Sequence, residues 1–341
     1  MTGLVLLAIA YPLGAQEPIR RPTVLPAPEP SNAERLFSSR ACGEYRLIVV
    51  DSADCSSDSG PVATSTDLRV SLSQAPAERP ATADVRQPNH LMGGLVVAAD
   101  LSLTLVNALA GYSHRSFHVN NEGFFGINTR DGGADKASHL TDYYVISKEL
   151  AFVYQRLGYS EDEARWWGFG VAVVGGLVNE IGDGFTHHGF SPEDFTMDFV
   201  GASAAWLVSK TKTQDLFGMR TSHIPGSTYA HDVYSADLSL HGVAKRLGIN
   251  IGPLRWLLFS VTYGAKGYRD SASPDQKQRQ IGLEIGLNLQ QILDDVKVTR
   301  DTWWGYALHM VADNVRFPYT AVGWRYDLNH GKWSGPNNGN Y

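Results

Sequence analysis

The spacing of apolar residues along the chain changes near Pro225, and this change predicts two kinds of secondary structure. Over residues 91–210 apolar residues recur every three to four positions, which is typical of amphipathic helices. After Pro225 they recur every second position, which is typical of half-buried strands. The fold class that we predict is α+β, with a compact bundle of about four helices followed by an antiparallel β-meander.

Two of the expected helices have clear start signals. Ser160 and Glu163 have the spacing of a capping box, so a helix is expected over residues 160–183. Ser191 is followed by Pro192 and two acidic residues, which predicts the start of a helix over residues 191–210.

Two further helices are expected over residues 91–112 and 134–157. The first segment is long enough to span a membrane, but it contains Asp100 and Asn107. Polar side chains inside an apolar helix fit a buried core helix better than a lipid-exposed one. The sequence leaves membrane insertion open and favours the core helix.

Alternation predicts the strands of the β-meander. The clearest segment is Ile281–Leu289, in which every second residue is isoleucine or leucine. Two comparable segments are Leu257–Ala265 and Val322–Leu328. Shorter signals at Leu238–Leu240 and Tyr306–Leu308 suggest two more strands.

The N-terminal region has the features of an exported protein. Leu4–Ala10 is an apolar run, and Ala15 is a small residue placed for cleavage, although the basic residues that normally begin a signal peptide are missing, so the true N-terminus stays open. No cysteine directly follows the run, so we do not expect a lipid-anchored N-terminus. Cys42 and Cys55 could close a short disulfide loop in an oxidising compartment, or could be two unrelated thiols.

The predicted organisation is a signal peptide over residues 1–15, a Pro/Ser-rich linker over 16–90, a helical domain over 91–210 and a β-rich region over 225–330. Hydrophobic residues make up 43% of the chain, which is enough for a sizeable core. The net charge of -6 argues against a nucleic-acid partner. The sequence has no phosphate loop, dinucleotide fingerprint or Gly-x-Ser-x-Gly motif, so no nucleotide cofactor is expected.

Three polar clusters interrupt the apolar helices, and they are the candidates for chemistry. An ionised side chain in an apolar helix is strongly unfavourable unless it has a partner. The simplest arrangement gathers the clusters into one polar centre between helices, where the lysine neutralises a carboxylate and the first histidine donates to another. The clusters are Asp135, Lys136 and His139; Glu180 and Asp183, followed by His187 and His188; and Ser191, Asp194 and Asp198.

The clusters, taken in order, resemble the YfiM-like group of predicted periplasmic proteins, with a more distant likeness to VanZ-like membrane proteins. The resemblance covers roughly residues 124–293. It implies an envelope location and a helical core, and it implies no activity. Asp198 stands where the group has asparagine. The matching positions are Asp135, Lys136 and His139, then Glu180, Asp183, Gly184 and Phe185, then Gly189, Phe190, Ser191, Asp194 and Gly201.

Three hypotheses follow for this exported protein of the periplasm or outer membrane. The polar centre is a structural ion-pair network that fixes helix register. Alternatively it is a metal or acid–base site, with His139, Glu180, Asp183 and His187 as candidate ligands for a divalent metal. It would then serve a hydrolase or transferase acting on a lipid or cell-wall component. The third hypothesis is a scaffold that contacts the membrane or an envelope component through its β region.

Structural roles are favoured, and the question of enzymatic activity stays open. If the protein is an enzyme, the candidate catalytic residues are those of the three clusters: Asp135, Lys136, His139, Glu180, Asp183 and Asp194.

Overall fold

The computed structural model describes residues 37–41, 44–48, 87–110, 115–222, 232–268 and 276–337. Residues 17–85 form one compact unit, and residues 86–341 belong to the other. In the first unit, β1 (Phe37–Ala41) and β2 (Glu44–Ile48) pair as an antiparallel hairpin. The expected signal peptide and the Cys42–Cys55 loop lie outside the described residues.

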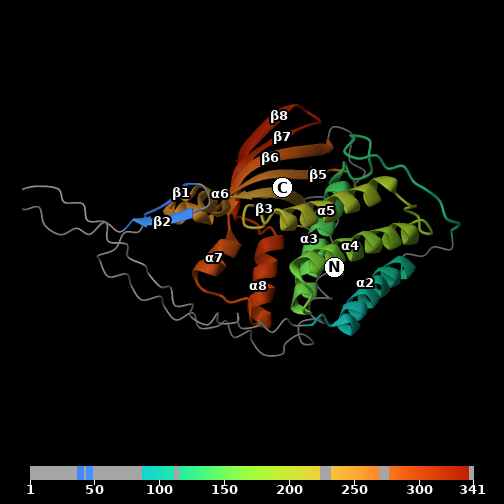
Figure 1. Ribbon diagram of the computed structural model, residues 1–341. Coiled ribbons are helices and arrows are strands. Elements are labelled where there is room, and N and C mark those ends of the chain that lie inside the picture. Colours follow the sequence, from blue (N-terminus) through green and yellow to red (C-terminus); the bar gives the residue numbers. More distant parts are fainter. Residues whose placement is uncertain are drawn as a thin grey trace, which may run out of the picture. The chain divides into compact units, whose positions relative to one another are not determined.

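Four helices form the bundle that the sequence predicts. They are α2 (His90–Ala110), α3 (Ala134–Arg156), α4 (Glu161–Asp183) and α5 (Pro192–Lys210). Helix α3 packs against both α4 and α5, which also contact each other, and α2 packs against α4 (Figure 1). Among the described residues, no helix is long and apolar enough to cross a membrane.

The predicted helix starts are confirmed by their caps. The Ser160 side chain accepts from the backbone N–H of Glu163, and the Glu163 side chain accepts from the Ser160 backbone N–H, as a capping box requires. At α5 the Ser191 side chain accepts from the backbone N–H of Asp194. These bonds satisfy backbone donors that the first helical turn leaves unpaired.

Glycines let the helices approach α3 closely. A Cβ atom on Gly168 of α4 would lie 2.5 Å from the carbonyl oxygen of Ser147 in α3. A Cβ atom on Gly201 of α5 would overlap the carbonyl oxygen of Leu140 in α3. Neither position has room for a larger residue, so these glycines set the spacing of the bundle.

The main apolar core lies among these helices and α8 (Trp303–Asn314). Its buried members come from every one of the five helices. They are Val96, Leu150, Val153, Tyr154, Val171, Ala172, Ala202, Tyr306 and Met310, with Leu157, Tyr159 and Ala164 from the turn between α3 and α4 and the start of α4.

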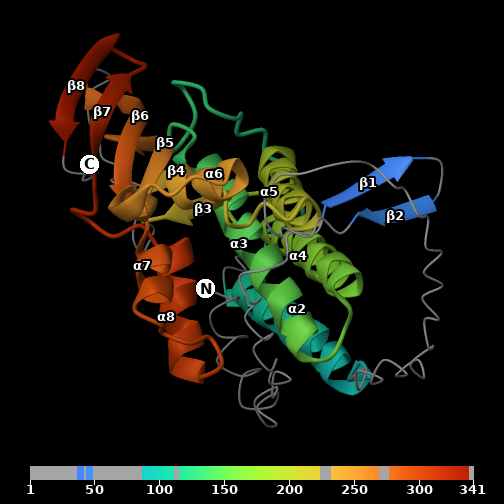
Figure 2. The ribbon, with the colours of Figure 1, turned by 60° about the vertical axis from the view of Figure 1, so that its left-hand side comes forward.

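The second half of the unit is one six-stranded antiparallel sheet. Its strands follow one another in chain order, which confirms the predicted meander (Figure 2). The strands are β3 (Phe217–Thr221), β4 (Val233–Ser239), β5 (Leu257–Lys266), β6 (Gln278–Leu287), β7 (Ala321–Asp327) and β8 (Lys332–Asn337).

Short helices connect some of the strands. They are α6 (Leu240–Leu247), the 3₁₀ helix η1 (Gly252–Trp256) and α7 (Leu289–Asp295), in addition to α8. The predicted strand at Leu238–Leu240 is therefore only half right, because Leu238 lies in β4 and Leu240 begins α6.

The predicted strand at Tyr306–Leu308 is wrong, because these residues lie inside α8. The Thr302 side chain caps this helix by accepting from the backbone N–H of Gly305. The buried residues Tyr306, His309 and Met310 recur at helical spacing. Two apolar residues that are two positions apart are too few to define a period, so they cannot distinguish a strand from a helix.

Candidate functional site

The structure brings together polar residues from all three sequence clusters, and we call this group the polar centre. Helix α3 contributes residues from its first two turns, α4 one residue from its last turn, and α5 two residues one turn apart. One further residue comes from the segment before α3. The members are Glu122, Asp135, Lys136, His139, Glu180, Asp194 and Asp198.

Lys136 is the main cation of the polar centre and is only 2% exposed. Its Nζ lies 2.6 Å from Glu122 Oε2, 2.7 Å from Asp194 Oδ1 and 3.0 Å from Asp135 Oδ2. Burial alone would lower the pKa of Lys136, but the carboxylates of Asp135 and Asp194 raise that pKa above its ordinary value. The ammonium group therefore stays charged and ties α3 to α5.

His139 is held by a carboxylate on each side. Its Nδ1 lies 2.7 Å from Asp198 Oδ1, while its Nε2 lies 3.7 Å from Asp194 Oδ1 and 3.8 Å from Asp135 Oδ1. Burial would lower the pKa of His139, but Asp198 above all raises it well above the ordinary histidine value. Together these contacts fix the direction in which each ring nitrogen points.

Two carboxyl groups lie deep beside this histidine. Glu180 is 1% exposed and Asp198 is fully buried. Glu180 Oε2 accepts from the backbone N–H of Ser191 at 3.1 Å. Among the residues that the structure describes, Glu180 Oε1 and Asp198 Oδ2 have no hydrogen-bond partner. A Cβ atom on Gly176 of α4 would lie 2.7 Å from Asp198 Oδ2, so this glycine leaves the room that Asp198 occupies.

Burial controls the protonation of both groups. It raises the pKa of Glu180 to about 8, although the nearby His139 opposes the shift. It raises the pKa of Asp198 to about 6, again against the effect of His139. Burial therefore favours the protonated form more strongly at Glu180 than at Asp198, whose carboxylate faces the imidazole.

Negative charge exceeds positive charge in the polar centre. Its members include five carboxyl groups but only two side chains that can be cationic, Lys136 and His139. Ionised carboxylates in a site of this kind need a cation or a proton for each uncompensated charge. A proton on Glu180 would remove one negative charge. The carboxylates that remain still outnumber the cationic side chains, which favours the binding of a further cation.

Two sets of atoms in the polar centre lie close enough to hold a metal ion. The first set comes from Asp135, His139 and Asp194, and the second from His139, Glu180 and Asp198. Within each set the ligand atoms lie within 4.8 Å of one another. Both sets use His139.

Asp183 and His187 belong to neither set of close atoms. Asp183 is half-buried at the last residue of α4, and burial raises its pKa to about 6. Its backbone carbonyl accepts from the N–H groups of Thr186 and Gly189, which shapes the turn before α5. His187 is exposed, with its ring 3.9 Å from the ring of His188.

Sequence reasoning missed Glu122. The backbone of Asn120 pairs with that of Phe190, and this pairing holds the segment before α3 against the turn before α5. Glu122 thereby reaches Lys136 across 14 residues of sequence. No local pattern marks this acid, because its partner is set only by the path of the chain.

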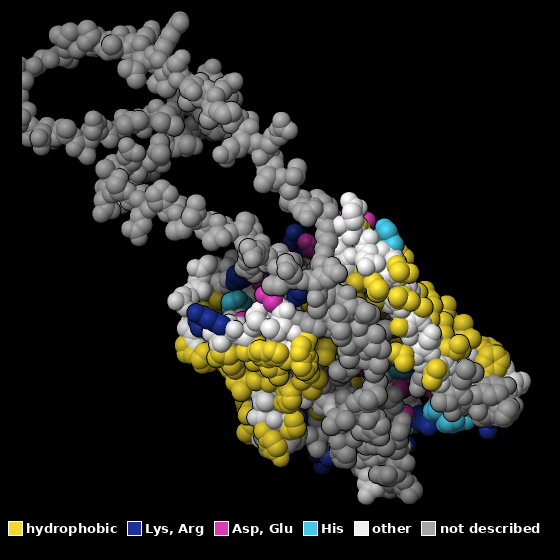
Figure 3. Space-filling view, turned by 90° about the horizontal axis from the view of Figure 1, so that it is seen from below, with side chains coloured by type: hydrophobic (Ala, Val, Ile, Leu, Met, Phe, Trp, Pro, Cys, Tyr) yellow, Lys and Arg dark blue, Asp and Glu magenta, His cyan; other side chains and the backbone are white. Residues whose placement is uncertain are grey.

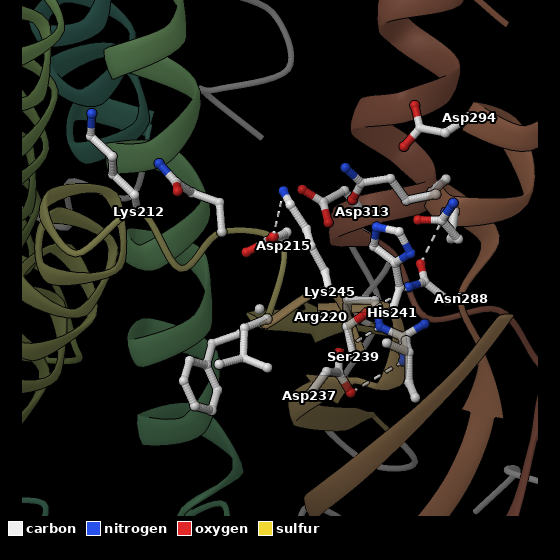
Figure 4. A pocket seen from close by; sticks show the side chains of 18 of the residues that line it. Lys212, Asp215, Arg220, Asp237, Ser239, His241, Lys245, Asn288, Asp294 and Asp313 are labelled. Carbon is white, nitrogen blue, oxygen red and sulfur yellow. Dashed lines mark hydrogen bonds and ion pairs between the residues drawn. The ribbon is translucent and has the colours of Figure 1, made fainter. Parts of the chain in front are cut away.

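A separate polar cavity of about 440 Å³ lies where β3 and β4 meet α6, α7 and α8. Figure 4 shows Lys245 beside Asp215, and Arg220 beside Asp237 at the base of the cavity. The Lys245 pair is 2.9 Å apart and the Arg220 pair 2.6 Å. Each of these two cations therefore has a carboxylate partner within the lining of the cavity.

Comparison with known families finds one similarity. Residues 121–210 match a family described as predicted periplasmic lipoprotein (DUF2279), whose function is not assigned. The matched range contains every member of the polar centre. No curated protein and no solved structure matches the chain. The similarity supports an envelope protein of unassigned activity. The description includes a lipid anchor, which the sequence analysis did not expect; residues 1–36 lie outside the described part.

Proposed function

We propose that this chain is an envelope protein whose helical bundle binds a divalent cation in the polar centre, between Asp135, His139 and Asp194. The orientation of His139 carries this proposal. Metal-binding histidines almost always donate their second ring N–H to a carboxylate or carbonyl, which fixes the tautomer. Asp198 is in place to accept that bond from Nδ1 at 2.7 Å.

The remaining ring nitrogen is directed at the two other carboxylates. The Nε2 atom lies 3.8 Å from Asp135 Oδ1 and 3.7 Å from Asp194 Oδ1. A tetrahedral ion with bonds of about 2.1 Å holds its ligand atoms about 3.4 Å apart. A small movement of the His139 ring would therefore bring Nε2 to the spacing of metal ligands from both carboxylate oxygens, and all three atoms already lie within 4.8 Å of one another. Mixed nitrogen and oxygen ligands suit zinc, manganese or iron.

Lys136 is the alternative to a metal ion. Its ammonium group already lies 2.7 Å from Asp194 Oδ1, so a structural network without metal would use this lysine as its cation. Lys136 also has Glu122 as a partner at 2.6 Å, and it can keep that pair when a metal binds Asp194. The excess of carboxyl groups favours the ion in addition to the lysine. An ion bound at Nε2 would take the place of the proton that the raised pKa of His139 otherwise keeps on this nitrogen.

The surroundings favour binding over turnover of a large substrate. The hollow that borders Asp135 and Lys136 has a volume of about 10 Å³, which is room for a water molecule. A hydrolase or transferase acting on a lipid or cell-wall component would need this site to open. We propose further that the protein resides in the periplasm or at the outer membrane. We also propose that it is related to the YfiM-like proteins that its motifs resemble.

The test is metal binding by the full-length protein after treatment with a chelator. Calorimetric titration with Zn²⁺ and with Mn²⁺ would be done for the wild type, His139→Gln and Asp194→Asn. The control is His187→Gln, which changes an exposed histidine outside the polar centre. We expect the wild type and the control to bind about one ion per chain, and the other two variants to bind at least tenfold more weakly, because each loses a ligand.

Two results would contradict the proposal. One is a wild type that binds neither ion while His139→Gln unfolds at a lower temperature, which would leave the polar centre a structural network. The other is an equal loss of binding in His187→Gln, which would move the ion to the surface histidines.

A further inference from the structure

The six-stranded sheet carries apolar side chains on its solvent-exposed face, where the sheet of a water-soluble protein normally carries polar ones. In β6, Leu283 is 55% exposed and Ile285 is 44% exposed, whereas Glu284 between them is buried. In β7, Trp324 is 52% exposed and its neighbour Arg325 is 2% exposed. A sheet with one solvated face usually alternates in the opposite sense, with apolar residues inside.

The strand register joins these residues into two continuous apolar rows that cross five strands. Every outward position in the two rows is apolar. Neighbouring strands lie about 4.8 Å apart, so each row is about 19 Å long. The first row is Met219, Ala236, Val261, Leu283 and Trp324, and the second is Phe217, Leu238, Phe259, Ile285 and Val322.

The buried face explains why the apolar residues remain outside. Glu284 pairs there with Arg325 at 3.2 Å and also with Arg316, and Arg220 pairs with Asp237 at 2.6 Å. Each of these pairs is almost completely buried. Turning the sheet over would separate Glu284 from Arg316, which follows α8, and would leave that buried arginine without its carboxylate, so the orientation of the sheet is strongly determined.

The rim of the apolar face carries aromatic and basic side chains at one end of the strands. The backbone N–H of Asn288 donates to the carbonyl of Trp256, which places Trp256 where β6 ends, and its indole N–H donates to Asp295. Tyr319, which is 73% exposed, precedes β7 at the same edge. Arg255 lies over the Trp256 ring, 5.8 Å from its centre, and its Nε lies 2.8 Å from Asp295 Oδ2.

The opposite end of the strands is also basic and aromatic. Lys277 precedes β6 and Lys332 begins β8, where it pairs in register with Asp327. Trp333 is 62% exposed beside Tyr326, with their ring centres 5.3 Å apart. Tryptophan and tyrosine favour the headgroup level of a membrane, and lysine and arginine are attracted to anionic lipids.

We propose that the apolar face of the sheet binds the surface of an anionic lipid bilayer, with the two rows in the acyl region and the rim at the headgroups. The apolar rows that cross five strands are surface of the kind that normally marks an interaction site. Figure 3, which does not label the strands, shows hydrophobic side chains in broad areas on the side of the molecule that it displays. This inference goes beyond the cation site and does not depend on it.

The test is flotation of the full-length protein with vesicles of phosphatidylglycerol and phosphatidylethanolamine, in the presence of a chelator. The first variant combines Val261→Gln, Leu283→Gln and Trp324→Gln. The matched control replaces three apolar residues of similar exposure on the helices: Leu95→Gln, Val174→Gln and Leu207→Gln. Circular dichroism would check that both variants fold.

The expected result is that the wild type and the helix variant float, while the sheet variant binds at least a hundredfold more weakly, because three apolar side chains no longer leave water. Replacing Lys277 and Lys332 with glutamine should weaken binding by about fivefold per residue on these vesicles, and not on neutral phosphatidylcholine vesicles. In the wild type, lipids brominated in their acyl chains should quench tryptophan fluorescence, and Trp324→Phe should reduce that quenching.

Three results would overturn the proposal. The first is a wild type that does not float and whose fluorescence brominated lipids do not quench. The second is an equal loss of binding in the helix variant, which would move the contact to the bundle. The third is a dimer in light scattering that the sheet variant converts to a monomer, without vesicle binding by either protein, which would make the face a protein interface.

Discussion

Replacing Asp100 with asparagine should make the stability of the protein less dependent on pH. Asp100 lies in α2, is 3% exposed, and has its Oδ2 beside Gly175 of α4. Burial alone raises the pKa of this carboxyl from 3.8 to about 6. The folded protein therefore binds a proton at Asp100 over a pH range in which the unfolded chain has released it.

The sign and size of the effect follow from this difference. Because the folded pKa is the higher one, the stability that Asp100 contributes is complete below the unfolded pKa and is lost as pH rises through the folded pKa. The shift of about two units corresponds to about 3 kcal/mol, since one pKa unit is about 1.4 kcal/mol. Asparagine does not titrate, so Asp100→Asn should gain about 2 kcal/mol relative to the wild type between about pH 4 and about pH 8.

Urea denaturation of both proteins over this pH range, with a chelator present, measures the difference. The quantity compared is how the difference in free energy of unfolding between variant and wild type changes with pH. An effect of the amide that is the same at every pH therefore cancels. The comparison variant is Asp162→Asn, at a side chain that is 82% exposed and pairs with Arg165 at the surface. A difference that does not change with pH for Asp100→Asn would refute the reasoning, because it would mean that the carboxyl is hydrated in the folded protein.

The other predictions concern packing in the bundle and in the sheet. Gly201→Ala should destabilise the protein by about 1–3 kcal/mol, because its Cβ would overlap the backbone of Leu140. A Cβ atom on Gly170 of α4 would meet no atom within 4 Å, so Gly170→Ala should stabilise the protein by about 0.5–1 kcal/mol. Equal shifts of the melting temperature in the two variants would contradict the close packing of Gly201 against α3. Glu284→Gln should cost about 3–5 kcal/mol in urea denaturation, since it leaves two buried arginines without their carboxylate, and a loss below about 1 kcal/mol would show that water reaches them.

The sequence by itself determined the elements whose signals are local. Ser160 with Glu163, and Ser191 with Pro192, fixed the starts of α4 and α5, because a cap acts within one turn of the residues that it serves. The alternation over Ile281–Leu289 identified β6, although the strand ends at Leu287 and Leu289 already belongs to α7. The same reasoning failed at α8, where two apolar residues were too few to define a period.

Polar residues on apolar helices also predicted that a polar centre exists, since buried charge requires partners. Its composition, however, came from contacts that are distant in the chain. Glu122 meets Lys136 only because the segment before α3 is held against the turn before α5. The partner of His139 is Asp198, which is 59 residues away.

The direction in which the sheet faces was decided only by tertiary structure. An alternating strand has two faces, and its sequence is the same whichever face is turned inward. Here Glu284 and Arg325 lie on neighbouring strands and meet Arg316 from the end of α8. These three charges can satisfy one another only when they share the buried face. The apolar residues of the same strands are thereby left on the outside, which no pattern within a single strand could have shown.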